Sequence, residues 1–537
     1  MNTTTPTGDG VTAVPPGLPD EAVLTRLANE FFRELPGQLG TVAPGYQPVT
    51  VPADLGAGAP GYQPVTVPAD VSAARPEWHG QSYVLPAASP PDAPSFYFVD
   101  ELTSPSALPA LPALPADASP PFDVGAIRRD FPILGERVHG RPLVWLDNAA
   151  TTQKPQVVID RLGYFYAHEN SNVHRGAHAL AVRATDAYED ARATVADFLG
   201  APSSESIVFT RGTTEAINLV AQAWGRRHIG AGDEIIISHL EHHANIVPWQ
   251  QLAAQVGAEL KVIPVDEDGQ LLLDAYADLL SERTRLVAVS HVSNVLGTIV
   301  PVSEVIEAAH RAGAVALIDG AQAVAHIPVD VSALDADFYV LSGHKVFAPL
   351  GIGALYGKPE LLEAMPPWQG GGNMIQDVTL EQTSYAQPPA RFEAGTGSIA
   401  DAVGLGAALG YLSRIGLAPI GRYEHELLAY ATREIQSVPG LRLIGTAPDK
   451  ASVLSFVLDG YRPEEVASAL DREGIAVRAG HHCAQPILRR YGLESAVRPS
   501  LAMYNTCGEV DLLVSALRRL AADAGRRTAP GGAAGSW

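Results

Sequence analysis

The sequence predicts an α/β protein with a large, mostly parallel sheet and a smaller C-terminal α/β part. Between residues 206 and 343, short runs rich in β-branched residues alternate with stretches of helical character. Most of these runs are apolar throughout, which is typical of parallel strands covered on both faces. The expected strands are SIVFT (206–210), EIIIS (234–238), LKVIPV (260–265), TRLVAVS (284–290), AVALID (314–319) and FYVLSG (338–343).

The composition of the chain changes near residue 122. Residues 1–121 contain no lysine and are rich in Pro, Ala and Gly. Such a segment buries too little apolar surface to offset its ordering entropy, so we expect a mostly disordered extension. A large domain is expected over 122–400, with 122–145 contributing to the small domain. The small domain is expected over 401–525, and a flexible tail over 526–537.

Short apolar motifs interrupt the extension. A capped helix is expected over 21–35, the stretch APGYQPVTVPAD occurs at 43–54 and again at 59–70, and SFYFVDE occupies 95–101. The run ALPALPALPAD at 107–117 suits an extended spacer. Duplication of a linker would explain the repeat. A pure spacer does not need large apolar side chains, however, so these motifs favour a docking tail.

Charge and cysteine content narrow the class of protein. The formal net charge of -22 argues against a nucleic-acid partner. Two cysteines, Cys483 and Cys507, do not make a disulfide framework, which favours the reducing cytoplasm. The N-terminus lacks a basic region followed by an apolar run, and no long apolar stretch occurs. We therefore expect neither a secretory signal nor a membrane span.

Three motifs at expected strand ends fit pyridoxal 5'-phosphate (PLP). Lys345 in SGHK can form a Schiff base with an aldehyde. Asp319 in DGAQ can pair with a pyridinium nitrogen, and Gln322 can donate to the ring O3′. His242 in EHHANIVPW can stack on the ring and move protons. Taken singly, each motif has a plain structural explanation, such as a solvated lysine or a helix cap.

A phosphate site is predicted at RGTTEAIN, where a strand passes through a tight turn into a helix. Backbone N–H groups at a helix N-terminus bind anions. The motif lacks the lysine of nucleotide-binding P-loops, so a single phosphate is expected. The residues predicted to contact it are Thr213, Thr214, Ser342 and His344.

A thiol and an arginine complete the predicted site. Cys483 lies in RAGHHCAQP beside Arg478, and positive neighbours raise the reactive thiolate fraction. Arg498 in RPSLAMYN can hold a substrate carboxylate through two hydrogen bonds. The adjacent His242 and His243 rarely share an ion, and no cysteine or histidine stands at ligand spacing along the chain, so no metal is predicted.

From Phe122 to Ala522 the chain resembles group II, SUF-type cysteine desulfurases. The matching motifs, in order, are LDNAATTQKP, NVHRGAHAL, RGTTEAINLVA, EHHANIVPWQ, HVSNVLGT, DGAQAV, SGHKVFAPLGIG, RFEAGTGS, RAGHHCAQP and RPSLAMYNT. The resemblance implies a PLP enzyme of fold-type I (aspartate aminotransferase-like) and a homodimer whose sites combine both subunits. It implies removal of sulfur from L-cysteine as a persulfide on Cys483. The acceptor would be a SUF-type protein, in iron–sulfur cluster assembly, or a small thiol.

The resemblance also assigns roles residue by residue. Catalysis falls to Cys483, Lys345 and His242, while the cofactor contacts are Lys345, Asp319, Gln322, His242, Thr213, Thr214, Ser342, His344 and Thr396. Thr396 would reach the phosphate of the partner subunit. Arg498, Asn294, His174 and Arg478 would line the substrate site. Gln369 stands where the family is expected to have glutamate, and the stretch before RFEAGT is one residue shorter. Both departures fall near the expected dimer contact.

The extension is similar to the cargo-loading tails of desulfurases packaged in encapsulin shells, which implies a shell protein as partner of residues 1–121. Two alternatives remain. A selenocysteine lyase would use the same apparatus, and a shell-interaction protein would have a vestigial or secondary enzymatic part. The complete set of motif residues weighs against the second alternative.

Overall fold

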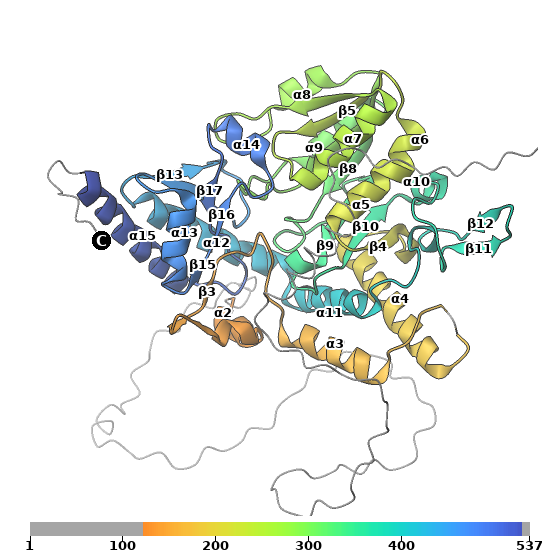
Figure 1. Cartoon of the computed structure of the whole chain (residues 1–537), viewed down its shortest axis with the longest axis horizontal. Helices are drawn as coiled ribbons and strands as arrows, with labels where there is room; N and C mark the ends of the chain where they lie inside the picture. The colour runs from red at the N-terminus through yellow and green to blue at the C-terminus, as the bar shows by residue number, and fades with distance from the viewer. Residues whose placement is uncertain (1–121, 175, 529–537) are drawn as a thin grey trace, which may run out of the picture. The chain divides into compact units, whose positions relative to one another are not determined.

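The structure, a computed structural model, describes residues 122–174 and 176–528 (Figure 1). The features expected within the extension, namely the helix at 21–35, the repeats and the cluster at 95–101, lie outside the described residues. The last helix, α15 (Cys507–Thr528), continues past residue 525, where the tail was predicted to begin.

A seven-stranded sheet forms the centre of the larger part of the described chain. Its order is β4 (Ile207–Thr210), β10 (Gly353–Gly357), β9 (Phe338–Ser342), β8 (Val315–Asp319), β7 (Thr284–Ser290), β5 (Glu234–Ser238) and β6 (Glu259–Ile263). All strands but β10 match the predicted runs. From β9 to β6 every pairing is parallel, and β10 alone is antiparallel to both of its neighbours. The mostly parallel sheet is confirmed.

Strand β10 was missed by the sequence analysis, because GALYG is short and begins and ends with glycine. Its first glycine has a packing function. A Cβ at Gly353 would lie 2.4 Å from the Leu341 carbonyl oxygen and 2.6 Å from the Gly212 Cα. Only glycine therefore lets β10 pass between β9 and the turn that follows β4.

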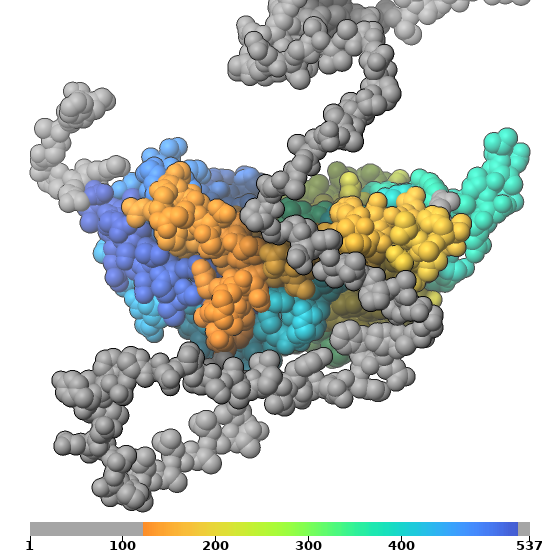
Figure 2. All heavy atoms as spheres, turned by 90° about the horizontal axis from the view of Figure 1, so that it is seen from below, coloured from red at the N-terminus to blue at the C-terminus, as the bar shows by residue number. Residues whose placement is uncertain are grey.

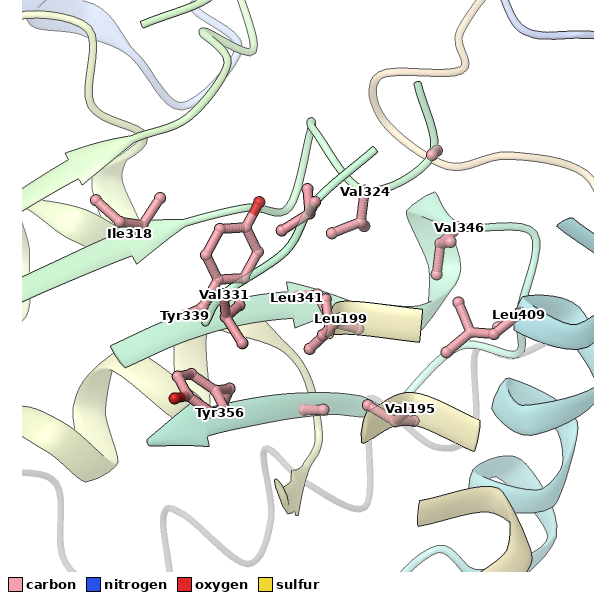
Figure 3. Packing of buried hydrophobic residues seen from close by; sticks show 14 of the residues in the cluster. Val195, Leu199, Ile318, Val324, Val331, Tyr339, Leu341, Val346, Tyr356 and Leu409 are labelled. Carbon is pink, nitrogen blue, oxygen red and sulfur yellow. The ribbon is translucent and has the colours of Figure 1, made fainter. Parts of the chain in front are cut away.

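Apolar side chains cover both faces of the sheet. Along β9, Tyr339 and Leu341 enter one core cluster, whereas Phe338 and Val340 enter a second. Because both faces of each strand are buried, successive residues are all apolar, and this explains the continuous apolar runs in the sequence. The first face packs against α3 (Gln156–His168), α4 (Ala179–Leu199), α9 (Val302–Arg311) and α11 (Ile399–Ile415), and the second against α5 (Thr213–Leu219) and α7 (Val247–Val256). Figure 3 shows part of the first cluster, with Leu199 of α4 beside Leu341 of β9 and Val195 of α4 near the end of β10.

A four-stranded antiparallel sheet organises the smaller part. Its order is β13 (Leu441–Ile444), β14 (Ser455–Leu458), β17 (Ala496–Arg498) and β16 (Arg478–Gly480). A third apolar cluster joins this sheet to α12 (Leu417–Gln436), α13 (Pro463–Asp471) and α15. Strand β3 (Val144–Trp145) pairs in parallel with β15 (Ile475–Ala476). The segment that begins at residue 122, orange in Figure 2, therefore adds Val144 to the smaller part.

The expected boundary between residues 400 and 401 falls inside α11. This helix packs mainly on α3 and α4, so its residues belong to the core of the larger part. The remaining α-helices and β-strands are α2 (Val124–Arg129), β1 (Arg137–Val138), β2 (Arg141–Pro142), α6 (Arg226–His228), α8 (Leu273–Leu279), α10 (Pro359–Ala364), β11 (Ile375–Val378), β12 (Thr383–Tyr385) and α14 (Gln485–Arg490). A π-helix (Val220–Gly225) joins α5 to α6.

Among the described residues, no single helix has the length and apolar composition needed to cross a membrane. The bent pair α11–α12 meets the criterion only when its two helices are taken together.

Candidate active site

The predicted site residues gather where the parallel strands end. Asp319 and Ser342 are the last residues of β8 and β9, and His242 and Asn294 follow β5 and β7. This edge is where open α/β sheets bind ligands. One cavity of about 180 Å³ is lined by Thr213, Thr214, His242, Asn294, Asp319, Ser342, His344, Lys345, Arg478, Cys483 and Arg498, together with Ala149, Ala150, Ala244, Ala321 and His482.

Three predicted residues do not line this cavity. The Gln322 side-chain nitrogen donates to the Ala149 carbonyl at 2.6 Å, directly behind the cavity wall. His174 pairs with Glu189 at 2.9 Å, a contact that is the main cause of its raised pKa. Thr396 lines a different cavity, of about 580 Å³.

Lys345 and Asp319 form the buried ionisable centre of the cavity. Burial lowers the pKa of the Lys345 ammonium to about 8, although the Asp319 carboxylate opposes this shift. Burial likewise raises the pKa of Asp319, which accepts a hydrogen bond from the Ala321 N–H at 3.0 Å. A buried carboxylate needs a cationic partner. A protonated pyridine nitrogen meets that requirement.

His242 is a neutral imidazole in this environment. Burial, together with the nearby charge of Lys345, lowers its pKa to about 3. Its Nδ1 accepts from the Ala244 N–H at 3.0 Å, so the proton of the neutral ring is on Nε2. A neutral ring can stack on an aromatic cofactor without placing a second cation beside Lys345.

The residue before His242 supports this loop. Glu241 is fully buried and accepts hydrogen bonds from the side chains of Ser238, Asn245 and Ser290 and from the Ser290 N–H. Burial raises the pKa of Glu241 to about 7. This carboxyl therefore ties the His242 loop to the ends of β5 and β7. The sequence analysis gave Glu241 no function, and its only signal was a charged residue next to an otherwise apolar strand end.

The four residues predicted to hold a phosphate, Thr213, Thr214, Ser342 and His344, line the cavity together. The Ser342 hydroxyl accepts from the Thr213 N–H at 2.9 Å and donates to the Thr213 hydroxyl at 2.9 Å. Gly212, at φ +146°, precedes the helix, and a Cβ there would lie 3.2 Å from the Ser342 oxygen. Burial lowers the pKa of His344, the last of these four residues, to about 4.

The thiol reaches the cavity on a strained loop. Cys483 has φ +56° and His482 has φ +52°, a region that non-glycine residues seldom adopt and that clusters at functional sites. Several hydrogen bonds hold the loop. They include Cys483 N–H to His481 Nδ1 at 3.0 Å, His243 N–H to the Cys483 carbonyl at 2.7 Å, Asn294 Nδ2 to the His482 carbonyl at 2.7 Å, and His482 Nε2 with the Ala496 carbonyl at 2.9 Å.

Arg498 is placed to receive an anion. Its Nη1 donates to the Asn294 carbonyl at 3.0 Å and its Nη2 to Asp147 at 3.1 Å, whereas its buried Nε has no partner among the described residues. Asn294 Oδ1 is likewise buried without a partner there. Asp147 also pairs with Arg478 at 3.3 Å. The sequence analysis missed Asp147 as the carboxylate that positions both arginines.

The residues of this cavity fit PLP. For PLP, Lys345 would supply the amine, Asp319 the counter-charge, His242 the flat ring, and Thr213 with Ser342 the phosphate contacts. Buried donors and acceptors without partners are costly, so the vacant bonding capacity of Arg498 and Asn294 indicates a polar ligand.

Comparisons with known proteins agree with this assignment. The aminotransferase class-V family matches residues 144–513. The cysteine desulfurase of Synechococcus elongatus is 62% identical over 451 residues, covering 81% of this chain and 72% of that protein. The probable cysteine desulfurase of Mycolicibacterium paratuberculosis is 66% identical over 400 residues, covering 74% of this chain and 58% of that protein. The crystal structure of the Escherichia coli cysteine desulfurase CsdA, in its S-sulfonic acid form, is 41% identical with a TM-score of 0.69, covering 74% of this chain and 98% of that one.

The fold and the cavity define a PLP-dependent enzyme of fold-type I. The chain belongs to the aminotransferase class-V family, and the named relatives within it are cysteine desulfurases.

Proposed function

We propose that this chain is a PLP-dependent cysteine desulfurase of the group II, SUF type, which converts L-cysteine to L-alanine and keeps the sulfur as a persulfide on Cys483. The observation that carries the proposal is the cavity that Cys483 shares with Lys345 and Arg498. An enzyme that only racemises or transaminates an amino acid has no use for a thiol there.

Each residue has a defined task in this reaction. Arg498 holds the substrate carboxylate through its Nε, which has no hydrogen-bond partner among the described residues. PLP, when bound, supplies an electron sink for the substrate carbon atoms. The amine of Lys345, with its pKa lowered to about 8, is the group that takes the Cα proton. Asp319 holds the opposite charge at the ring nitrogen.

The sulfur transfer balances within these residues. The Cys483 thiolate attacks the substrate sulfur, and an S–S bond forms as the Cβ–S bond breaks. The electron pair of the broken bond passes to the substrate carbon, which is protonated and leaves as alanine. No external oxidant or reductant enters until an acceptor thiol, on a SUF-type protein or a small molecule, takes the persulfide sulfur.

A homodimer is part of the proposal. Thr396 and His174, which the family pattern assigns to the site, lie outside the cavity of their own chain. Both would act in the site of a second copy. Gln369 lines the same large cavity as Thr396 and donates to Glu215 at 3.3 Å, so the departure from the family pattern falls at the proposed dimer contact.

The extension is proposed to load the enzyme into an encapsulin shell in the cytoplasm. Its support is the set of repeated and apolar motifs within residues 1–121. Co-expression of the full chain, and of a chain lacking residues 1–121, with an encapsulin shell protein tests this proposal. Equal amounts inside the purified shells would contradict it.

The desulfurase proposal is tested by mass spectrometry after brief exposure of the purified enzyme to L-cysteine, with alanine measured in parallel. The Cys483 peptide should gain one sulfur atom as alanine appears. Cys483→Ser should keep the cofactor and lose both products, whereas Cys507→Ser should behave as the parent enzyme. Undiminished alanine formation by Cys483→Ser would overturn the thiol mechanism and favour direct lyase chemistry, including that of a selenocysteine lyase.

A further inference from the structure

The fold brings three side chains that can bind a metal together at the loop 481–484, which carries Cys483 and is called the thiol loop below. His243, His481 and Cys483 each offer one ligand atom, and these atoms lie within 4.8 Å of one another. Within the described ranges, they form the only such group of three. The two imidazole rings are stacked with their centroids 5.6 Å apart.

Two different parts of the chain build this cluster. His243 follows β5 of the large sheet, whereas His481 and Cys483 follow β16 of the small sheet. The His243 N–H donates to the Cys483 carbonyl at 2.7 Å, so the two loops are already joined. Spacing along the chain gave no indication of this contact, which is why the sequence analysis found no ligand partner for His243.

The lone pairs of both rings are directed at the thiol loop. Nδ1 of His481 accepts from the Cys483 N–H at 3.0 Å, and Nε2 of His243 accepts from the Gln485 N–H at 3.3 Å. These are neutral hydrogen bonds, and the second is long. A cation bound between the rings would take both lone pairs in place of two backbone N–H groups.

We propose that His243, His481 and Cys483 form a zinc-binding site. Thiolate sulfur and imidazole nitrogen are the ligands that Zn²⁺ prefers, and three protein ligands with one open position form a site that solvent or a small thiol can enter. Zn–S bonds of about 2.3 Å and Zn–N bonds of about 2.0 Å place tetrahedral ligands roughly 3.3–3.6 Å apart. Since the ligand atoms lie within 4.8 Å of one another, the cluster has to contract by at most about 1.2–1.5 Å to bind the ion.

The exposure of the cluster permits this contraction. His481 is exposed, and His243 and Cys483 are half-buried, so an ion reaches them from solvent without opening the core. Zinc on Cys483 takes up the lone pair with which the thiolate attacks the substrate. If the proposed desulfurase function is correct, Zn²⁺ is a reversible inhibitor that prevents persulfide formation.

The test is titration of the full-length, PLP-loaded enzyme with Zn²⁺ in competition with a chromophoric chelator, in the absence of L-cysteine. We expect the parent enzyme to bind one more zinc ion per chain than Cys483→Ser. His243→Ala and His481→Ala should each weaken that site by more than about tenfold, as expected for loss of a ligand. Cys507→Ser, which removes the other free thiol, should bind zinc as the parent does.

Zinc binding by Cys483→Ser with the stoichiometry and affinity of the parent enzyme would overturn the proposal. Parent-like affinity in both histidine variants would overturn it as well. A second measurement uses alkylation of Cys483, which zinc should block and a chelator should restore. Neither measurement needs turnover, so the two proposals can fail separately. If the protein binds zinc in this way but forms no persulfide, the metal site stands and only the desulfurase function is refuted.

Discussion

Replacement of Arg498 by lysine tests how the substrate is held. The guanidinium is almost fully buried, with 2% of the side chain exposed, and it already donates to Asp147 and Asn294. Lysine keeps the charge, but its three N–H groups project from one nitrogen and lack the planar fork with which Arg498 reaches Asp147, Asn294 and a substrate carboxylate from separate nitrogens. One charge-assisted hydrogen bond, worth about 1.5–3 kcal/mol, should be lost.

At about 1.4 kcal/mol for each factor of ten, this loss corresponds to a KM for L-cysteine that is raised roughly 10- to 100-fold. The carboxylate is held equally in the ground state and the transition state, so kcat should change little. Initial rates of alanine formation against L-cysteine concentration measure both constants. Arg490→Lys is a suitable control, because Arg490 pairs with Glu267 at the surface at 2.6 Å. An Arg498→Lys enzyme that retains its cofactor absorbance and the parent KM would refute this role of Arg498.

Three further predictions concern protonation and packing. Burial lowers the pKa of Lys345 to about 8, so the fraction of neutral amine should rise with pH through a midpoint near pH 8 and level off only well above that pH. The rate at which cofactor-stripped enzyme recaptures PLP should follow this curve, and a rate independent of pH would contradict it. Arg192→Met removes the guanidinium that contacts the buried Glu393 at 2.6 Å. The free energy of unfolding, measured in urea, should fall by roughly 3–5 kcal/mol, and the double variant with Glu393→Gln should recover part of this loss of stability. A Cβ at Gly320 would lie 2.1 Å from the buried Tyr339 ring, so Gly320→Ala should destabilise the protein by at least about 1–3 kcal/mol.

Controls separate these packing effects from general damage. Gly163 lies in α3 with nothing near the position of an added Cβ, so Gly163→Ala should not lower stability, since alanine favours helix over glycine. If Gly163→Ala and Gly320→Ala lower the free energy of unfolding equally, the close approach of Tyr339 to Gly320 does not contribute to stability. An Arg192→Met protein as stable as the parent would mean that water or another group satisfies Glu393.

Local patterns in the sequence were sufficient for much of the site. A parallel strand buried on both faces appears as a short apolar run, and the residues at its carboxyl end face the ligand edge of the sheet. Lys345, Asp319 and His242 were identified in this way, because each is adjacent to such a run. The reactive thiol was recognised because Cys483 lies in RAGHHCAQP beside Arg478, and positive neighbours raise the thiolate fraction.

What the sequence by itself determined was therefore the class of fold, most of the strands and the chemical groups of the cavity. Tertiary structure alone decided which distant groups meet: β10 with the Gly212 turn, Glu241 with β7, Asp147 with Arg498, and His243 with Cys483. Strand patterns arise from burial over a few neighbouring residues. The first two contacts depend on the order of strands within the large sheet, and the last two depend on how the two sheets pack together. No short stretch of sequence records either arrangement.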